Sequence, residues 1–201
     1  MCGRFYIPEP GDSPERLETI LRQAEARGGQ PMKRGEISPG DTAAVLVRSR
    51  AGQIAAFPMR WGFQLGDRLV FNARSESVGV KPTFRESLER RRCLVPVAHY
   101  FEWDHRYHPR PKYRFALPAG GVMYLAGLYR MEGKTPVFTV LTREAPPELA
   151  VFHNRMPVIP AAPRARAWLD ATVDPDWALA DAQSALEWRT ETPTLLDWMD
   201  A

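Results

Sequence analysis

Apolar residues in this sequence occur in short runs, and the longest of them, residues 122–129, has the length of a β-strand. A helix that crosses a bilayer needs about 20 predominantly apolar residues, so no segment is predicted to span a membrane. Many of the 19 prolines and 14 glycines lie between these runs, where they favour turns. With 44% hydrophobic residues among 201, the chain can still bury a core and is expected to form one domain.

The pattern of short segments predicts an α+β fold. A helix is expected to begin at Ser13-Pro14, with a capping hydroxyl and a proline in the first turn, and to end near Arg27 before two glycines. Further helices are expected at residues 84–92, 147–152, 163–168 and 174–185. Strands are expected at residues 2–7, 42–47, 53–61, 69–71, 93–103, 112–117, 122–129 and 136–141, with a loop at 30–41.

Short strands with peripheral helices are typical of a strongly bent, barrel-like antiparallel sheet. Residues 42–47 and 53–61 are predicted to pair across a tight turn. We therefore expect a single domain over residues 1–201, in which residues 170–201 form an acidic, helical C-terminal extension.

The net charge of +3 is distributed unevenly along the chain. From Asp170 onward there are eight acidic residues and one arginine, so the preceding part holds 26 basic and 16 acidic side chains. Only four of the 27 cations are lysines. Because the planar arginine fork suits phosphate, an anionic partner such as nucleic acid is one interpretation. The arginine codons of a GC-rich genome are the other.

The cysteine count and the N-terminal segment indicate the compartment. Two cysteines form no disulfide framework, and Arg4 and Glu9 stand where a signal peptide would need an apolar core. We therefore expect a cytoplasmic protein without membrane association. We also expect it to be a monomer.

Cys2 is the first candidate for chemistry. If Met1 is removed, the chain begins with a 1,2-aminothiol whose amine and thiol have ordinary pKa values of about 8 and about 8.5. Such a group attacks an aldehyde through a Schiff base, and the thiol then closes a thiazolidine ring. The alternative is that Cys2 is only a small residue in a first strand.

Three other segments carry polar groups between apolar flanks. Asn72 follows a short strand and could orient a nucleophile, Glu102 lies between two aromatic residues that would raise its pKa, and His153 could carry protons near neutral pH. Each feature also has a structural interpretation: an Asn turn, an edge strand with a solvated carboxylate, and a turn containing a histidine.

Cys93, His99, His105 and His108 lie close together in the sequence and are of the residue types that bind metals. Their order fits no standard zinc spacing, and strand alternation sends Cys93 and His99 to opposite faces. Phosphate-loop and dinucleotide glycine patterns are also missing. We therefore expect neither a metal nor a cofactor.

Seven segments, each weak alone, occur together in a specific order from Cys2 to about Leu169. They are Met1-Cys2-Gly3-Arg4-Phe5, Arg60-Trp61-Gly62, Asn72-Ala73-Arg74-Ser75-Glu76, Arg91-Arg92-Cys93-Leu94-Val95-Pro96, Phe101-Glu102-Trp103, Ala126-Gly127-Leu128 and His153-Asn154-Arg155-Met156-Pro157. This set resembles the SOS response-associated peptidase (SRAP) family of abasic-site sensors.

The resemblance implies a protein that binds single-stranded DNA and crosslinks to abasic sites, shielding the lesion. It makes Cys2 the nucleophile and Asn72 the group that positions it. Glu102 would transfer protons during sugar-ring opening and Schiff-base formation, and His153 would assist ring opening and crosslink reversal. It also implies self-removal of Met1, which would explain the peptidase label, and allows lyase activity.

The same resemblance implies a DNA-binding surface. Arg4, Arg74 and Arg155 would hold phosphates, while Pro39 and Trp61 would pack against bases near the lesion. The protein would then associate with the nucleoid when bound to DNA.

Two other functions remain open from the sequence. Cys2 and His153 could act as a thiol peptidase on other proteins. Alternatively, the basic part of the chain could be a non-covalent single-stranded DNA-binding module, for which Cys2 would be dispensable.

Overall fold

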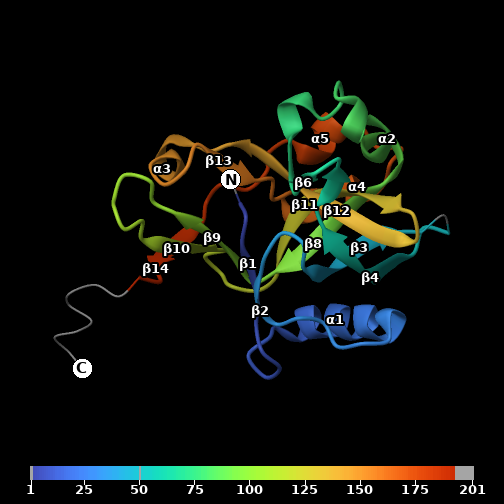
Figure 1. The fold of residues 1–201 in the computed structure, drawn as a ribbon, viewed down its shortest axis with the longest axis horizontal. Helices are drawn as coiled ribbons and strands as arrows, with labels where there is room; N and C mark the ends of the chain where they lie inside the picture. Colours follow the sequence, from blue (N-terminus) through green and yellow to red (C-terminus); the bar gives the residue numbers. More distant parts are fainter. Residues whose placement is uncertain (1, 50, 193–201) are drawn as a thin grey trace.

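A closed ring of five strands forms the centre of the molecule (Figure 1). The computed structural model describes residues 2–49 and 51–192. The ring runs β11–β8–β3–β4–β12 and closes where β11 pairs with β12. Its strands are β3 (Thr42–Arg48), β4 (Ile54–Trp61), β8 (Arg92–Val97), β11 (Met123–Glu132) and β12 (Thr135–Glu144). The predicted α+β fold with a barrel-like sheet is confirmed.

A second sheet of five strands lies beside the barrel. Its order is β14–β10–β9–β1–β2, and every pairing in it is antiparallel. The strands are β1 (Phe5–Ile7), β2 (Gly35–Ile37), β9 (His99–Trp103), β10 (Lys112–Ala116) and β14 (Glu187–Thr190). Phe5 lies opposite Tyr100, and the Phe101 amide donates to the Arg4 carbonyl. This register brings the N-terminal residues alongside the end of β9.

Two short strands flank the C-terminal half of β12. β7 (Asn72–Arg74) pairs with it in parallel, and β13 (Arg155–Pro157) pairs with it in antiparallel orientation. Segments more than 80 residues apart in the sequence are thereby joined through one strand. β5 (Phe63–Leu65) and β6 (Arg68–Val70) form a separate hairpin before β7.

Helices cover the two sides of the barrel. α1 (Glu15–Gly28) packs on β3 and β4, and buries its apolar face there. It ends where Gly29 adopts a φ of 69°, a conformation that glycine tolerates best. Figure 1 places α2, α4 and α5 on the opposite side. The remaining helical bounds are η1 (Ser75–Ser77), α2 (Pro82–Arg90), α3 (Pro147–Ala150), α4 (Ala162–Trp168) and α5 (Pro175–Leu179).

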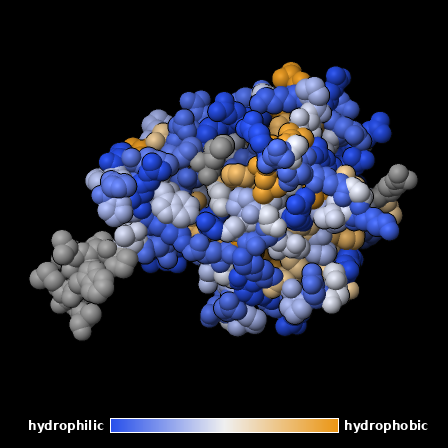
Figure 2. Space-filling view, in the orientation of Figure 1, coloured by the Kyte–Doolittle hydropathy of each residue, from blue (hydrophilic) through white to orange (hydrophobic). Residues whose placement is uncertain are grey.

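The apolar side chains gather inside the barrel and under the helices. β8 is buried along its whole length, and β3 is buried at its five central positions. Figure 2 shows a mainly hydrophilic outer face. Within the part of the chain that is described, no helix has the length and apolar character that a bilayer crossing requires.

The structure corrects several predictions about secondary structure. The strand expected over residues 93–103 is two strands, because the Ala98 amide donates to the Tyr6 carbonyl and the chain passes from the barrel into the second sheet. The loop at residues 30–41 contains β2, which pairs with β1. The sheet is not wholly antiparallel, since β12 pairs in parallel with both β4 and β7. Ser13 makes no side-chain cap for α1.

The C-terminal extension is less helical than expected. The helix predicted at residues 174–185 is only the five residues of α5, because Ala180 returns to an extended conformation and Asp181 has a φ of 55°. The chain then enters β14 at the edge of the second sheet. Residues 193–201, the end of the predicted extension, lie outside the described residues.

Candidate active site

Cys2 lies at the junction between the barrel and the second sheet. Its side chain is fully buried, and its thiol donates to the Arg4 carbonyl at 3.9 Å. The Asn72 side-chain amide donates to the Cys2 carbonyl with an Nδ2–O distance of 2.8 Å. β7 therefore fixes the backbone of Cys2 from the barrel side. Met1, whose removal would free the Cys2 amine, lies outside the described residues.

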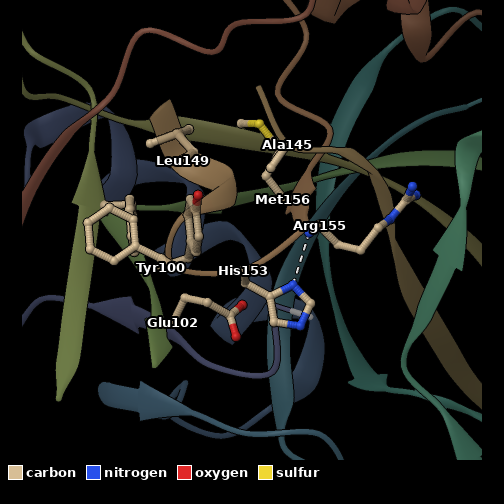
Figure 3. A pocket seen from close by; sticks show the side chains of 9 residues that line it. Tyr100, Glu102, Ala145, Leu149, His153, Arg155 and Met156 are labelled. Atoms are coloured by element: carbon tan, nitrogen blue, oxygen red, sulfur yellow. Dashed lines mark hydrogen bonds between the residues drawn. The ribbon is translucent and has the colours of Figure 1, made fainter. Parts of the chain in front are cut away.

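Glu102 approaches the same place from β9. It is only 6% exposed, and burial raises the pKa of its carboxyl above the ordinary 4.5. It lines a small recess together with Tyr100 and Phe115. Figure 3 shows its carboxylate pointing toward His153. A raised pKa lets this carboxyl hold its proton at a higher pH than an exposed glutamate does, which suits a group that takes part in proton transfer.

His153 lies just before β13, in the turn that follows α3. The Arg155 backbone amide donates to Nδ1 of its imidazole at 2.9 Å (Figure 3). A neutral imidazole that accepts at Nδ1 carries its proton on Nε2. Burial lowers the pKa of His153 to about 4, so at neutral pH the ring is uncharged and its Nε2–H is a donor.

The electrostatics of Cys2 favour a protonated thiol. Burial, followed by the nearby charge of Glu102, raises the pKa of this thiol to about 12. The thiolate form therefore needs a base at the moment of reaction, and the Glu102 carboxylate is close enough to influence it electrostatically. Burial is also the main reason why the pKa of Tyr100 is raised, and the nearby Cys2 and Glu102 raise it further.

Asn72 offers a second polar atom to this site. Its Oδ1 is buried and has no hydrogen-bond partner among the described residues, although its Nδ2 is bonded to Cys2. Buried polar atoms are rarely left in this state, and a substrate hydroxyl or amine would satisfy it. The structure thus brings together the four predicted catalytic residues Cys2, Asn72, Glu102 and His153.

The three arginines predicted to hold phosphate differ in availability. Arg74 is exposed at the end of β7, and no ion pair involves it in the described part of the chain. Arg4 is partly exposed, donates to the Ser38 hydroxyl and lies 3.8 Å from a carboxylate oxygen of Glu36. Both side chains come from segments next to Cys2 or Asn72.

Arg155 is committed to a structural contact. Its guanidinium binds the Glu76 carboxylate with two hydrogen bonds of 2.7 and 2.8 Å, and it also donates to the Thr142 carbonyl at 2.6 Å. This pairing lowers the pKa of Glu76 to about 2. Figure 3 shows the Arg155 side chain extending away from Glu102 and His153. A phosphate could bind here only by displacing Glu76.

The two residues predicted to pack against bases also have different positions. Pro39 is partly exposed in the turn before β3, where the Gly40 amide donates to the Trp61 carbonyl. Trp61 is fully buried, with its ring 4.8 Å from Phe5 and its indole N–H bonded to the Phe71 carbonyl. The expectation that Trp61 packs against a base is therefore contradicted; this residue is part of the core.

Arg155→Ala is expected to destabilise the fold by about 2 kcal/mol, because three hydrogen bonds of a largely buried guanidinium are lost between η1, β12 and β13. For a protein of this size, that corresponds to a decrease in Tm of about 4–8 °C, measurable by calorimetry. Glu76→Gln is the matched control, and should cost less because Glu76 is half exposed. An unchanged Tm in Arg155→Ala would contradict the structural role.

Acid is expected to destabilise the protein between pH 6.5 and pH 4. Burial lowers the pKa values of His99 and His153 from 6.5 to about 4, so the folded state binds fewer protons than the unfolded state in this range. Their contribution to stability is complete above pH 6.5 and is lost as the pH falls through 4. The raised pKa of Glu102 acts in the opposite direction.

The measurement is Tm as a function of pH for the wild type and for a His99→Gln, His153→Gln double variant. The variant should show a flatter curve between pH 6.5 and 4.5, whatever its absolute Tm. Parallel curves would show that other groups cause the loss.

Two residues of the site were not proposed from the sequence. Tyr100 is buried beside Cys2 and Glu102, and only the aromatic pattern of its segment gave a signal. His105 is exposed in the turn after β9, with its ring 5.5 Å from that of His153. No spacing rule could have paired these two histidines, because they are 48 positions apart and meet only through the fold.

Comparison with known proteins gives one family. A family model described as SOS response associated peptidase (SRAP) matches residues 1–193. Abasic site processing protein YoqW of Bacillus subtilis is 32% identical over 194 residues, which cover 88% of this chain and 84% of the relative. Abasic site processing protein YMR114C of Saccharomyces cerevisiae is 31% identical over 207 residues, covering 85% of this chain and 55% of the relative.

Solved structures share the same fold. A crystal structure of a protein from Bordetella bronchiseptica has a TM-score of 0.72 and 21% sequence identity, covering 96% of this chain and 100% of the other. A protein from Bacteroides thetaiotaomicron has a TM-score of 0.71 and 17% identity, covering 94% and 91%.

Proposed function

The chain belongs to the SOS response-associated peptidase family, and on this basis we propose that it recognises abasic sites in single-stranded DNA and crosslinks to them through Cys2 after Met1 has been removed. The relatives described above carry the name of abasic site processing proteins. The observation that carries the proposal is the meeting of Cys2, Asn72, Glu102 and His153 at one buried junction.

The chemistry follows from an aminothiol and an aldehyde. The abasic deoxyribose opens to expose its C1′ aldehyde, and the Cys2 amine adds to this carbon. Loss of water gives a protonated Schiff base, and the Cys2 sulfur then adds to the same carbon as its proton leaves. The product is a thiazolidine, and the net change is the loss of one water molecule. With the imine consumed, the sugar no longer has the electron sink that strand scission needs.

The four side chains have separate roles in the reaction. Glu102 takes the proton of the Cys2 thiol, because a thiol with a pKa near 12 is otherwise a poor nucleophile. As the sugar ring opens, the proton of the C1′ hydroxyl moves to the ring oxygen, and the Nε2–H of His153 donates a hydrogen bond to that oxygen, since this imidazole is neutral and fixed through its Nδ1. Asn72 holds the Cys2 carbonyl and offers its Oδ1, which has no partner within residues 2–49 and 51–192, to the Cys2 amine or a sugar hydroxyl.

Binding of the strand is assigned to the rim of this junction. Arg74 and Arg4 would contact phosphates, with Pro39 beside them, and these contacts carry no sequence preference. The protein would act as a monomer on single-stranded DNA in the nucleoid. We include self-removal of Met1 as the hydrolytic step that gives the family its peptidase name, and lyase activity as the outcome when the Schiff base is not captured by sulfur.

A peptidase that acts on other proteins is a weaker alternative. Cysteine peptidases depend on a thiol with a lowered pKa beside a histidine that can be charged. Here burial moves both groups the other way: it raises the pKa of Cys2 and lowers that of His153. The arrangement suits a neutral thiol deprotonated during addition to an imine.

The experiment is intact mass spectrometry of the purified full chain mixed with single-stranded DNA. The probe strand carries one uracil converted to an abasic site by uracil glycosylase, and the controls are the untreated strand and the abasic strand reduced with borohydride. We expect a chain lacking Met1 that gains the mass of the strand minus one water, and only with the aldehyde. Processed protein that binds all three strands without gaining mass would support the non-covalent module instead.

A further inference from the structure

Glu102, His105 and His153 bring together three side chains of the kind that bind metals. One ligand atom from each lies within 4.8 Å of the other two. They come from three separate places: β9, the turn after β9, and the turn before β13. The proposed reaction uses Glu102 and His153 but gives His105 no role.

The donor set suits a zinc-class cation. Two imidazole nitrogens and one carboxylate oxygen occur in catalytic zinc sites, in which a fourth position stays open. Magnesium and calcium prefer oxygen ligands and would gain little from two histidines. One carboxylate also gives the site a single negative charge, which partly balances a dication.

The geometry requires only a modest closure. With metal–ligand bonds of about 2.0–2.1 Å, ligand atoms in a tetrahedral site lie roughly 3.3 Å apart, so the widest pair must approach by about 1.5 Å. His105 is exposed, and its ring is inclined at 68° to that of His153. Rotation of this one side chain can shorten its own distances to Glu102 and His153, which are both less exposed.

One hydrogen bond limits the affinity. Nδ1 of His153 accepts from the Arg155 amide at 2.9 Å, which leaves the proton on Nε2. The imidazole must give up this bond, or move its proton, before it can coordinate a metal. We therefore expect a site that exchanges its metal readily rather than one that holds the fold together.

We propose that Glu102, His105 and His153 form an exchangeable site for a divalent cation of the zinc class, and that the bound cation blocks crosslinking by occupying Glu102 and His153. The fourth ligand is either water or the Cys2 thiolate. Metal binding stands independently of the proposed function, whereas the inhibition rests on it.

The first test is titration of the metal-free, Met1-processed full chain with Co²⁺, followed by competition with Zn²⁺. We expect one equivalent of Co²⁺ with the strong visible absorption of a four-coordinate ion, and a near-ultraviolet charge-transfer band only if Cys2 is the fourth ligand. His105→Gln should weaken binding at least about tenfold. His108→Gln is the matched control, because His108 is exposed in the same turn and outside the cluster.

Equal affinities of the wild type, His105→Gln and His108→Gln would overturn the site, as would the absence of a four-coordinate spectrum. Circular dichroism establishes that each variant is folded, which is expected because both histidines are exposed.

The second test is the rate of crosslinking to the abasic strand with and without Zn²⁺, each variant being normalised to its own rate in EDTA. Zn²⁺ should slow the wild type and His108→Gln reversibly, and His105→Gln should need at least about tenfold more Zn²⁺. Inhibition that is the same in all three proteins would overturn the proposal and assign the effect to Cys2 alone. Co²⁺ binding without any adduct in EDTA would instead refute the proposed function and leave the metal site standing.

Discussion

Cys2→Ser is expected to abolish the stable adduct with abasic DNA while leaving the N-terminal amine in place. The serine hydroxyl is a far weaker nucleophile than sulfur, so the reaction should stop at the Schiff base. Borohydride reduction should still trap this intermediate, because the amine and Glu102 are retained. The measurement compares adduct mass and yield with and without borohydride, after denaturation in hot detergent. We expect the adduct to fall to background without borohydride and to reappear with it.

The chain offers a matched control in its other cysteine. Cys93 is also fully buried, and burial raises the pKa of its thiol as well, but it lies inside the barrel on β8. Cys93→Ser should lower Tm, because it places a hydroxyl in the core, and should leave adduct formation intact. A stable adduct in Cys2→Ser, or its loss in a folded Cys93→Ser, would remove Cys2 from the proposed role. Loss of DNA binding in Cys2→Ser would show that Cys2 is mainly structural.

Local sequence patterns predicted the parts of the fold that local interactions determine. The hairpin of β3 and β4 and the end of α1 at two glycines are confirmed. The break at Ala98 has no local signal, because it depends on a hydrogen bond to Tyr6 across the molecule. The parallel pairing of β4 with β12 joins Arg60 and Val137, which are far apart in the sequence, and alternation of apolar residues cannot reveal strand order.

The same distinction applies to the site. The resemblance carried by the order of the seven segments selected Cys2, Asn72, Glu102 and His153, and the fold brings them together. Exposure could not be predicted from the motifs. A tryptophan or an arginine in a DNA-binding family suggests contact with DNA, yet Trp61 is enclosed by aromatic rings. Arg155 is held by Glu76 in a similar way. The two residues meet because β7, which precedes Glu76, and β13, which begins with Arg155, both pair with β12.

Glu102→Gln is expected to slow crosslinking by roughly 10²–10⁴-fold, the usual contribution of a general acid–base group. Glutamine keeps the shape of the side chain but cannot take the thiol proton. Affinity for the abasic strand should change little, because Glu102 is buried and the proposed phosphate contacts lie at the rim. Tm is expected to rise slightly, since the buried carboxylate, whose desolvation raises its pKa, is replaced by a neutral amide.

The measurement is the single-turnover rate of crosslinking between pH 5 and pH 8, with affinity determined separately by fluorescence anisotropy. In the wild type the rate should fall as the pH falls through the raised pKa of Glu102, because the protonated carboxyl cannot act as the base. The variant should lack this dependence. Glu144→Gln, at an exposed position at the end of β12, is the matched control and should behave as the wild type. A slow rate with the wild-type pH profile would mean that Glu102 only shapes the recess, and the thiol proton would then need another acceptor.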